Sequence, residues 1–307
     1  MATILGVVAP VFAIIALGWI AASRRFIDEG GFRGLNAFTF NVATPALLFA
    51  GGTSAHHGGG AAALVFFVGS LLIFALGVVV ARRVLGKDLG AGSLFALNAA
   101  FGNTVMMGIP LVVAAYGQPG LVILIAILAL HSMVLLGLAT VLAEVGLNAN
   151  GSWGRVLRAT VLGVAHNPIV MTVLTAFVWH LLDLPVPGPM RRTLELLGGA
   201  GPPTALFCLG GSLAGFQAAG AWREVAWLSA LKLLVMPLLV WGLCFVFGLG
   251  ALETAVAVTT AALPTGANAF LLARRYAIGA ETSGATVLVS TLISVLTLAM
   301  VLAGFRG

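Results

Sequence analysis

Two short stretches of this chain place helix-breaking and hydrogen-bonding residues inside otherwise apolar sequence. The first, "FGNTVMMGIPLVVAAYG", covers residues 101–117, and the second, "ALPTGANAFLL", covers residues 262–272. Inside a lipid bilayer every backbone polar group needs a partner, and an amide side chain is costly unless something uses it. The candidate ligand-binding residues are Asn103, Thr104, Gly108 and Pro110 in the first stretch and Pro264, Thr265, Gly266 and Asn268 in the second.

Prolines and amides together predict an anion site. Proline removes a backbone N–H and clashes with the carbonyl four residues back, so Pro110 and Pro264 predict a break in each helix. A break leaves free N–H groups at the start of one half-helix, where the partial positive charge favours an anion. Asn103 and Asn268 can donate and accept hydrogen bonds, so they suit a carboxylate or exposed backbone. The alternative is that these residues only kink and pack the helices.

Composition indicates an integral membrane protein. Of 307 residues, 61% are hydrophobic and 8% are charged, and the mean hydropathy is +1.13. A soluble domain carries about a quarter charged residues. Charged and Gly/Pro-rich breaks divide the chain into ten apolar segments, most of them near the ~20 residues that cross a bilayer. The segments are 3–22, 32–52, 61–81, 91–115, 119–146, 160–182, 193–216, 224–248, 252–274 and 281–304.

The basic residues give the topology. If the segments alternate in direction, one set of loops holds eleven Lys and Arg residues and the opposite set holds three, Arg191, Arg192 and Arg306. The positive-inside rule then places the eleven in the cytoplasm and both termini outside, in what we expect to be a bacterial inner membrane. Because most of the net charge of +6 lies in loops, we expect no nucleic acid partner. The eleven are Arg24, Arg25, Arg33, Arg82, Arg83, Lys87, Arg155, Arg158, Arg223, Arg274 and Arg275.

The chain also repeats over about half its length. "TPALLFAGG" (44–52) recurs as "PPTALFCLGG" (202–211), and Tyr116 and Tyr276 end the fourth and ninth segments. Each repeat would hold five spans, and an odd number inverts the second copy in the membrane. Inverted repeats with discontinuous helices are typical of secondary transporters. The predicted fold is an all-α integral membrane protein with ten transmembrane helices in two inverted five-helix repeats, in which broken helices 4 and 9 cross.

Three motifs resemble signatures of the auxin efflux carrier family, particularly its bacterial branch, and the similarity covers essentially the whole chain. They are "FRGLNAFTFNVATPALLF" (32–49), "NTVMMGIPLVVAAYG" (103–117) and "LPTGANAFLLARRY" (263–276). The resemblance implies a scaffold of helices 1, 2, 6 and 7 and a mobile transport core of helices 3–5 and 8–10. It also implies a substrate at the crossover, with Asn103 as a contact and Pro110 and Pro264 at the crossing point.

The same resemblance bears on domains, substrate and partners. The plant PIN-formed members have a long hydrophilic segment after the fifth span, whereas residues 147–159 form a short loop here. Bacterial members are associated with small carboxylates such as malate and malonate. We expect a first repeat at 1–147, a cytoplasmic linker at 148–158 and a second repeat at 159–307. We also expect a homodimer in the lipid bilayer, with no cofactor and no metal. We expect Gly210-Gly211 to ease the sliding of helices past one another.

Two ionisable residues lie inside predicted spans. Lys232 is either a charge that partners the substrate or a carbonyl, or an anchor that snorkels to the interface. His131 is either a proton relay or a neutral packing histidine. The predicted core spans contain no mid-membrane Asp or Glu, which argues against sodium coupling. An anion leaving a negative interior gains ~2.3 kcal/mol per charge per 100 mV, so potential-driven export needs no coupling ion.

These observations favour an elevator-type secondary transporter for small organic anions, either mono- or dicarboxylates. The alternative within transport is a sodium- or proton-coupled organic-anion symporter. A channel or a membrane receptor is a further alternative. An intramembrane enzyme is disfavoured because Ser212 in "GGSLAG" has no histidine in an equivalent place, and Asp28, Asp88 and Asp183 all fall in predicted loops.

Overall fold

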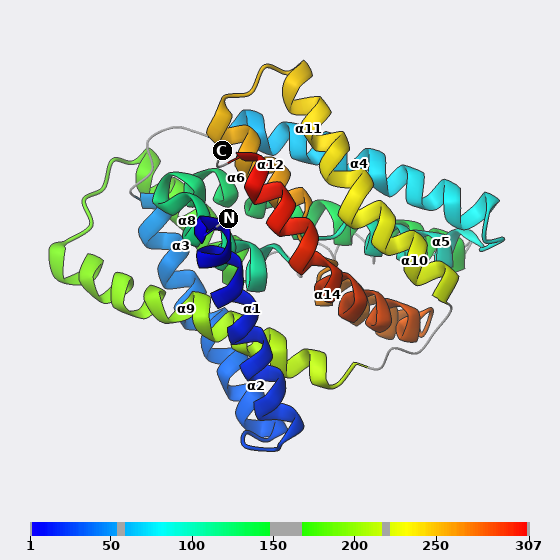
Figure 1. Ribbon diagram of the computed structural model, residues 1–307. Coiled ribbons are helices and arrows are strands. Elements are labelled where there is room, and N and C mark those ends of the chain that lie inside the picture. The colour runs from blue at the N-terminus through cyan, green and yellow to red at the C-terminus, as the bar shows by residue number, and fades with distance from the viewer. Residues whose placement is uncertain (1, 54–58, 148–167, 217–221, 306–307) are drawn as a thin grey trace.

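The structure is a computed structural model that describes residues 2–53, 59–147, 168–216 and 222–305, and its elements there are helices (Figure 1). The predicted linker 148–158 lies outside the described residues. In the first half the helices are α1 (Ala2–Ser23), α2 (Glu29–Phe38), η1 (Thr39–Ala43), α3 (Thr44–Thr53), α4 (Gly60–Arg83), α5 (Leu89–Ala100), η2 (Thr104–Gly108) and α6 (Ile109–Leu147). In the second half they are α8 (Pro168–Leu181), α9 (Gly188–Ala214), α10 (Trp222–Ala230), η3 (Leu231–Val235), α11 (Met236–Val246), α12 (Ala251–Ala261), α13 (Ala267–Tyr276) and α14 (Ala280–Phe305). The η elements are π-helical turns.

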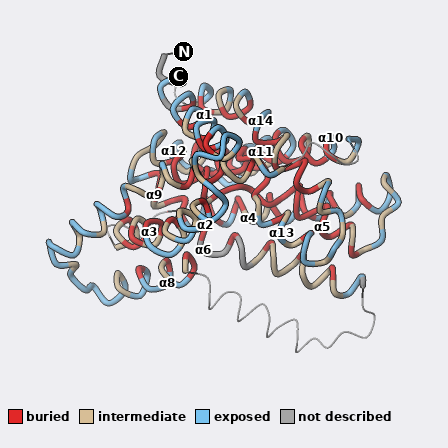
Figure 2. The backbone as a smooth tube through the Cα atoms, turned by 90° about the horizontal axis from the view of Figure 1, so that it is seen from below, coloured by how far each residue is buried: buried red, intermediate tan, exposed pale blue. Residues whose placement is uncertain are grey.

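Four helical stretches of the described chain are long and apolar enough to cross a membrane. They are Gly60–Arg83, Thr104–Leu128, Trp222–Val246 and Ala280–Phe305. Buried residues gather in the middle of the molecule (Figure 2), while large apolar side chains such as Phe177 on α8 and Phe245 on α11 face outward, as lipid contact requires. The protein is therefore an integral membrane protein. Helices lie over all ten predicted segments, but their ten crossings and the inverted repeat stay predictions.

Each π-helical turn lies just before a proline. The residue that precedes the proline donates its N–H to the carbonyl five residues back: Thr44 to Thr39, Ile109 to Thr104, and Met236 to Leu231. A proline lacks the N–H of an α-helix and crowds the carbonyl four residues back, and the wider π-turn absorbs both defects. Pro110 consequently lies in a continuing helix, so the prediction that it breaks the fourth span is wrong.

The helices pack as two bundles (Figure 1). In the first bundle α1 packs along α9, and α3 contacts both α8 and α9, with α2 and η1 attached. In the second bundle α4, α5 and α6 pack on one another and on α11 and α12, with α10, α13 and α14 joined to them.

Glycines bring the backbones of α1 and α9 together. A Cβ atom at Gly18 would overlap the backbone carbonyl of Phe207, and one at Gly210 would overlap the carbonyl of Ile15. A Cβ at Gly211 would collide with the ring of Phe32. Only glycine allows such a close approach. Gly210 and Gly211 therefore let α9 pack tightly against α1 and α2, and that they ease helix sliding stays a prediction.

Candidate functional site

Two helix interruptions meet near the middle of the molecule. α5 ends at Ala100 and η2 begins at Thr104, while α12 ends at Ala261 and α13 begins at Ala267. The intervening residues pair as an isolated antiparallel bridge between Gly102 and Thr265. The bridge satisfies backbone groups that the missing helical turns leave without partners.

The hydrogen bonds of this crossing are symmetric. The N–H of Asn103 donates to the carbonyl of Pro264 at 2.8 Å, and the N–H of Gly266 donates to the carbonyl of Phe101 at 3.0 Å. Asn103 and Gly266 are the N-cap residues of the two helices that follow. Each interruption thus supplies the backbone partners of the other.

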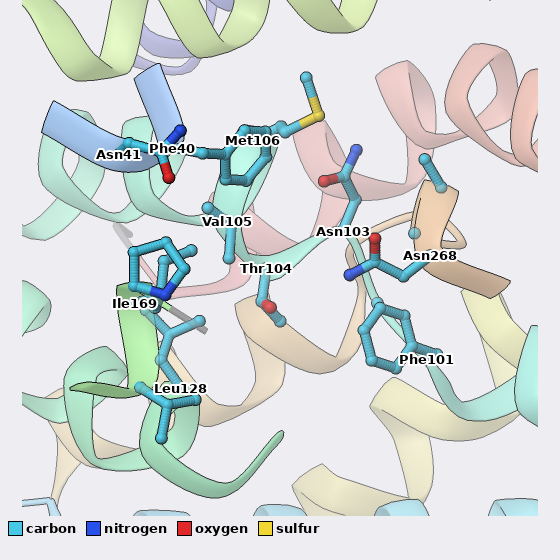
Figure 3. Close-up of a pocket in the computed structure, with 15 residues that line it drawn as sticks. Phe40, Asn41, Phe101, Asn103, Thr104, Val105, Met106, Leu128, Ile169 and Asn268 are labelled. Carbon is cyan, nitrogen blue, oxygen red and sulfur yellow. The ribbon is translucent and has the colours of Figure 1, made fainter. Parts of the chain in front are cut away.

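A cavity of about 400 Å³ lies against the crossing, between the two bundles (Figure 3). The second bundle contributes both interruptions and Leu128, and the first bundle contributes η1 and the start of α8. The lining residues are Phe40, Asn41, Phe101, Gly102, Asn103, Thr104, Val105, Met106, Leu128, Pro168, Ile169, Val170, Gly266, Ala267 and Asn268. Both bundles and the crossing therefore border this space.

Two helix N-termini face the cavity. Thr104, Val105 and Met106 form the first turn after one interruption, and Ala267 and Asn268 begin the helix after the other. N–H groups in a first helical turn have no intrahelical partners, and the end of the helix carries partial positive charge. Two such ends at one cavity make it suited to an anion.

The two asparagines come from different interruptions, and both line the cavity (Figure 3). Asn103 is 5% exposed, and its Nδ2 has no hydrogen-bond partner. Asn268 is exposed where it lines the cavity. A buried amide donor without a partner costs about 1–3 kcal/mol, which a bound acceptor would recover.

The other predicted site residues divide into two groups. Thr104 and Gly266 line the cavity, whereas Gly108, Pro110, Pro264 and Thr265 are buried and are not among its lining residues. Thr265 donates its hydroxyl to the carbonyl of Asn98 at 2.9 Å, and its N–H donates to Oγ of Ser290 at 3.1 Å. These contacts hold the interruption in place behind the cavity wall.

Lys232 lies directly behind the crossing. Its side chain is fully buried, so it does not snorkel to an interface. Its Nζ donates to the carbonyl of Ala261 at 2.6 Å and contacts Sδ of Met236 at 3.2 Å. Gly102, which lines the cavity, lies next to Nζ: a Cβ built at Gly102 would lie 3.5 Å from Nζ.

His131 is also fully buried near the crossing. Its ring lies against Phe101, with ring centroids 4.5 Å apart, and against Phe66, at 5.6 Å. Neither ring nitrogen makes a hydrogen bond, and His131 is not among the cavity-lining residues. The surroundings are those of a packed aromatic ring.

The sequence analysis did not predict the residues that the first bundle contributes to the cavity wall. Phe40 and Asn41 lie in η1, and Pro168, Ile169 and Val170 begin α8. A signal for Asn41 does exist, because it precedes Pro45 by the same four residues that separate Met106 from Pro110. The α8 residues carry no such signal, since they are ordinary apolar residues.

The part of the chain that the structure describes contains no set of metal ligands. No group of three His, Cys, Asp or Glu side chains is close enough there to hold a metal ion. The ion pairs found among those residues, Lys87–Glu224 and Arg192–Glu195, lie away from the cavity.

Long apolar helices and a cavity at paired helix interruptions define an integral membrane transporter. The chain belongs to the family described as "Membrane transport protein", whose model matches residues 3–302 and which is the auxin efflux carrier family that the three motifs resemble. It is 29% identical to a "Putative malonate transporter" of Rhizobium meliloti, over 97% of this chain and 94% of that protein. It is 24% identical to the "Uncharacterized transporter YfdV" of Escherichia coli K12, over 95% of both chains. An "Uncharacterized transporter" of Methanothermobacter thermautotrophicus is likewise 24% identical, over 94% of both chains. The protein is a transporter and not an enzyme.

Proposed function

We propose that this transporter moves small organic anions, mono- or dicarboxylates, which bind in the cavity at the helix crossing. The observation that carries the proposal is the buried, unpartnered Nδ2 of Asn103 at a cavity that two helix N-termini face. A carboxylate brings both the acceptor that this amide lacks and the charge that the helix ends favour. The name of the Rhizobium relative makes malonate the first substrate to test.

The proposed mechanism is an elevator. The first bundle corresponds to predicted helices 1, 2, 6 and 7 and acts as scaffold, and the second bundle corresponds to helices 3–5 and 8–10 and acts as transport core. Residues of both bundles line the cavity, so displacement of one bundle past the other would open it to alternate sides. The proposal includes ten transmembrane helices in two inverted repeats, and the symmetric hydrogen bonds at the crossing support it.

The proposed direction is export driven by the membrane potential. In this orientation the arginine-rich loops lie inside and both termini lie outside a bacterial inner membrane. Because the interior is negative, outward movement of an anion releases ~2.3 kcal/mol per charge per 100 mV of membrane potential. This energy corresponds to roughly 50-fold accumulation per charge. Sodium- or proton-coupled symport is the alternative. A homodimer is part of the proposal as the functional assembly.

Transport by purified protein in liposomes tests the site. Asn103→Ala and Asn268→Ala should each weaken the apparent affinity for malonate by about 10- to 100-fold, because each removes a hydrogen bond to a charged ligand. Asn36→Ala is the matched control, since the Asn36 amide donates to the carbonyl of Phe32 in α2, away from the cavity. Solid-supported membrane currents with a panel of carboxylates give the affinities.

The outcomes separate the alternatives. If both Asn103→Ala and Asn268→Ala transport malonate like the wild type, the site is wrong. Uptake that requires a sodium or proton gradient favours the symporter, and a current that does not saturate with substrate favours a channel. Binding without flux favours a receptor.

A further inference from the structure

A single buried amine lies at the negative ends of the two interrupted helices. Lys232 lies in η3, inside the apolar stretch Trp222–Val246 that is long enough to span a membrane. Proline causes this placement, because the π-turn that carries Lys232 is the one that accommodates Pro237. An ionisable side chain at such a depth requires a specific partner.

Lys232 lies at the C-terminal ends of two helices and donates a hydrogen bond to one of them. Ala261 is the last residue of α12, so its carbonyl is one of those that have no intrahelical donor. Gly102 follows the end of α5 by two residues and lies next to Lys232 Nζ. The C-terminal end of a helix carries partial negative charge. The crossing is therefore bipolar: two N-termini face the cavity, and Lys232 lies at the C-terminal side.

No carboxylate neutralises Lys232 in the described chain. The ion pairs there are Lys87–Glu224 and Arg192–Glu195, and neither includes this amine. His131, another ionisable residue, packs on Phe101 at the crossing. The counter-charge of Lys232 is thus supplied by peptide dipoles and, when substrate is bound, by the anion in the cavity that Gly102 lines.

We propose that Lys232 is a tethered cation that takes the place of a coupling ion at the crossing. Carbonyl oxygens at two helix ends are ligands of the type that bind Na⁺ in ion-coupled carriers with broken helices. The Lys232 amine satisfies one of these carbonyls and cannot dissociate, so substrate binding is not linked to a cation gradient. This inference rests on the proposed function, and it assigns the reason for sodium independence to one residue.

The first test needs only the wild-type protein. Malonate binding, followed by thermal shift in detergent, and malonate transport in liposomes should be the same in NaCl as in N-methyl-D-glucamine chloride. Sodium-dependent binding or transport by the wild type overturns the proposal, and this measurement does not depend on whether any variant folds.

The second test removes the tethered cation and supplies it from solution. Lys232→Met, which keeps the side-chain volume, should lower malonate affinity by about tenfold or more. Lys232→Ala should regain malonate binding when methylammonium or Na⁺ is added, an effect that a purely structural lysine would not produce. Lys87→Met is the matched control, because Lys87 is the chain's only other lysine and pairs with Glu224 outside the crossing.

The results distinguish the two proposals. A wild type that neither binds nor transports any carboxylate contradicts the proposed function. Carboxylate transport that is unchanged by Lys232→Met, or a monodisperse Lys232→Ala protein that no small cation restores, contradicts only the role of Lys232.

Discussion

Buried polar side chains at the crossing differ in whether the fold itself satisfies them. Thr265 is fully buried and its hydroxyl reaches the carbonyl of Asn98, one of the last carbonyls of α5. Asn103 is nearly as buried, yet its Nδ2 has no partner. A hydrogen bond that forms within the protein contributes to its folding stability, with or without a ligand. A buried donor without a partner gains one only when a ligand binds. The two residues should therefore affect different measurements.

Replacing Thr265 with valine tests its structural role. Thr265→Val keeps the shape but leaves the buried carbonyl of Asn98 without its donor, so the free energy of unfolding should fall by about 1–3 kcal/mol. Malonate affinity should change little, because Thr265 does not line the cavity. Thermal unfolding in detergent and a binding isotherm measure the two quantities.

The control for this variant is Thr193→Val. Thr193 donates in the same way to the carbonyl of Pro189, but on the exposed surface of α9. Its unfolding free energy should change by less than about 0.5 kcal/mol. Equal losses for the two valine variants would contradict the capping role of Thr265.

Three helices of this protein accommodate a proline with a widened turn, and α1 and α9 approach each other through glycines. The turns before Pro45, Pro110 and Pro237 are π-helical, and they place Asn41, the first turn of η2 and Lys232 around the crossing. Such turns recur at functional sites because they alter the direction of side chains without ending the helix. The glycines of α9 instead hold the first bundle together.

A pair of glycines on α9 tests that packing. Gly210→Ala places a Cβ against the backbone of α1, so it should destabilise the protein by about 1–3 kcal/mol through overpacking. Gly199→Ala has no atom within 4 Å of its new Cβ, and the better helix propensity of alanine should leave stability equal or slightly higher. Thermal unfolding in detergent compares the two, and a smaller loss at Gly210 than at Gly199 would show that α1 and α9 are not packed closely there.

The arrangement of the two bundles determines what the cavity can do. Because each bundle supplies part of the wall, movement between them changes access to the crossing. Contacts such as that of α3 with α6 join the bundles, whereas contacts such as that of α3 with α8 lie within the first bundle. The elevator proposal requires only contacts of the first kind to change.

Cross-linking the bundles should stop transport. A Cβ at Gly51 would lie 3.3 Å from Cδ1 of Ile125, so cysteines at these positions of α3 and α6 can be bridged by Hg²⁺ or by a short bis-methanethiosulfonate reagent, which forms a disulfide with each thiol and releases sulfinate. The bridge should lower malonate flux by about tenfold or more, and a reductant or thiol should restore it. The native Cys208 and Cys244 are buried and serve as the unmodified background.

The control pair lies inside the first bundle. A Cβ at Gly52 would lie 2.9 Å from Cβ of Ala176, so cysteines there join α3 to α8. This bridge should leave malonate flux unchanged. Arrest by both bridges, or by neither, would contradict rigid displacement of one bundle past the other.

The sequence by itself determined the membrane class, the family and the two polar stretches that bear the site. Composition and apolar length reflect transfer from water to lipid, which depends on residue type more than on packing. The same local reasoning placed the fourth-span break at Pro110, where the chain remains helical through a π-turn. Proline chemistry alone does not distinguish a break from a widened turn, because both relieve the same lost N–H and the same clash.

Only the tertiary structure decided where the break falls and what surrounds it. The chain leaves the helix at Phe101–Asn103, without a proline, because the second interruption supplies the backbone partners that lipid cannot. The wall from η1 and α8, and the contact of Lys232 with the end of α12, likewise join residues far apart in the chain. Such pairings depend on packing between helices, and no local pattern encodes them.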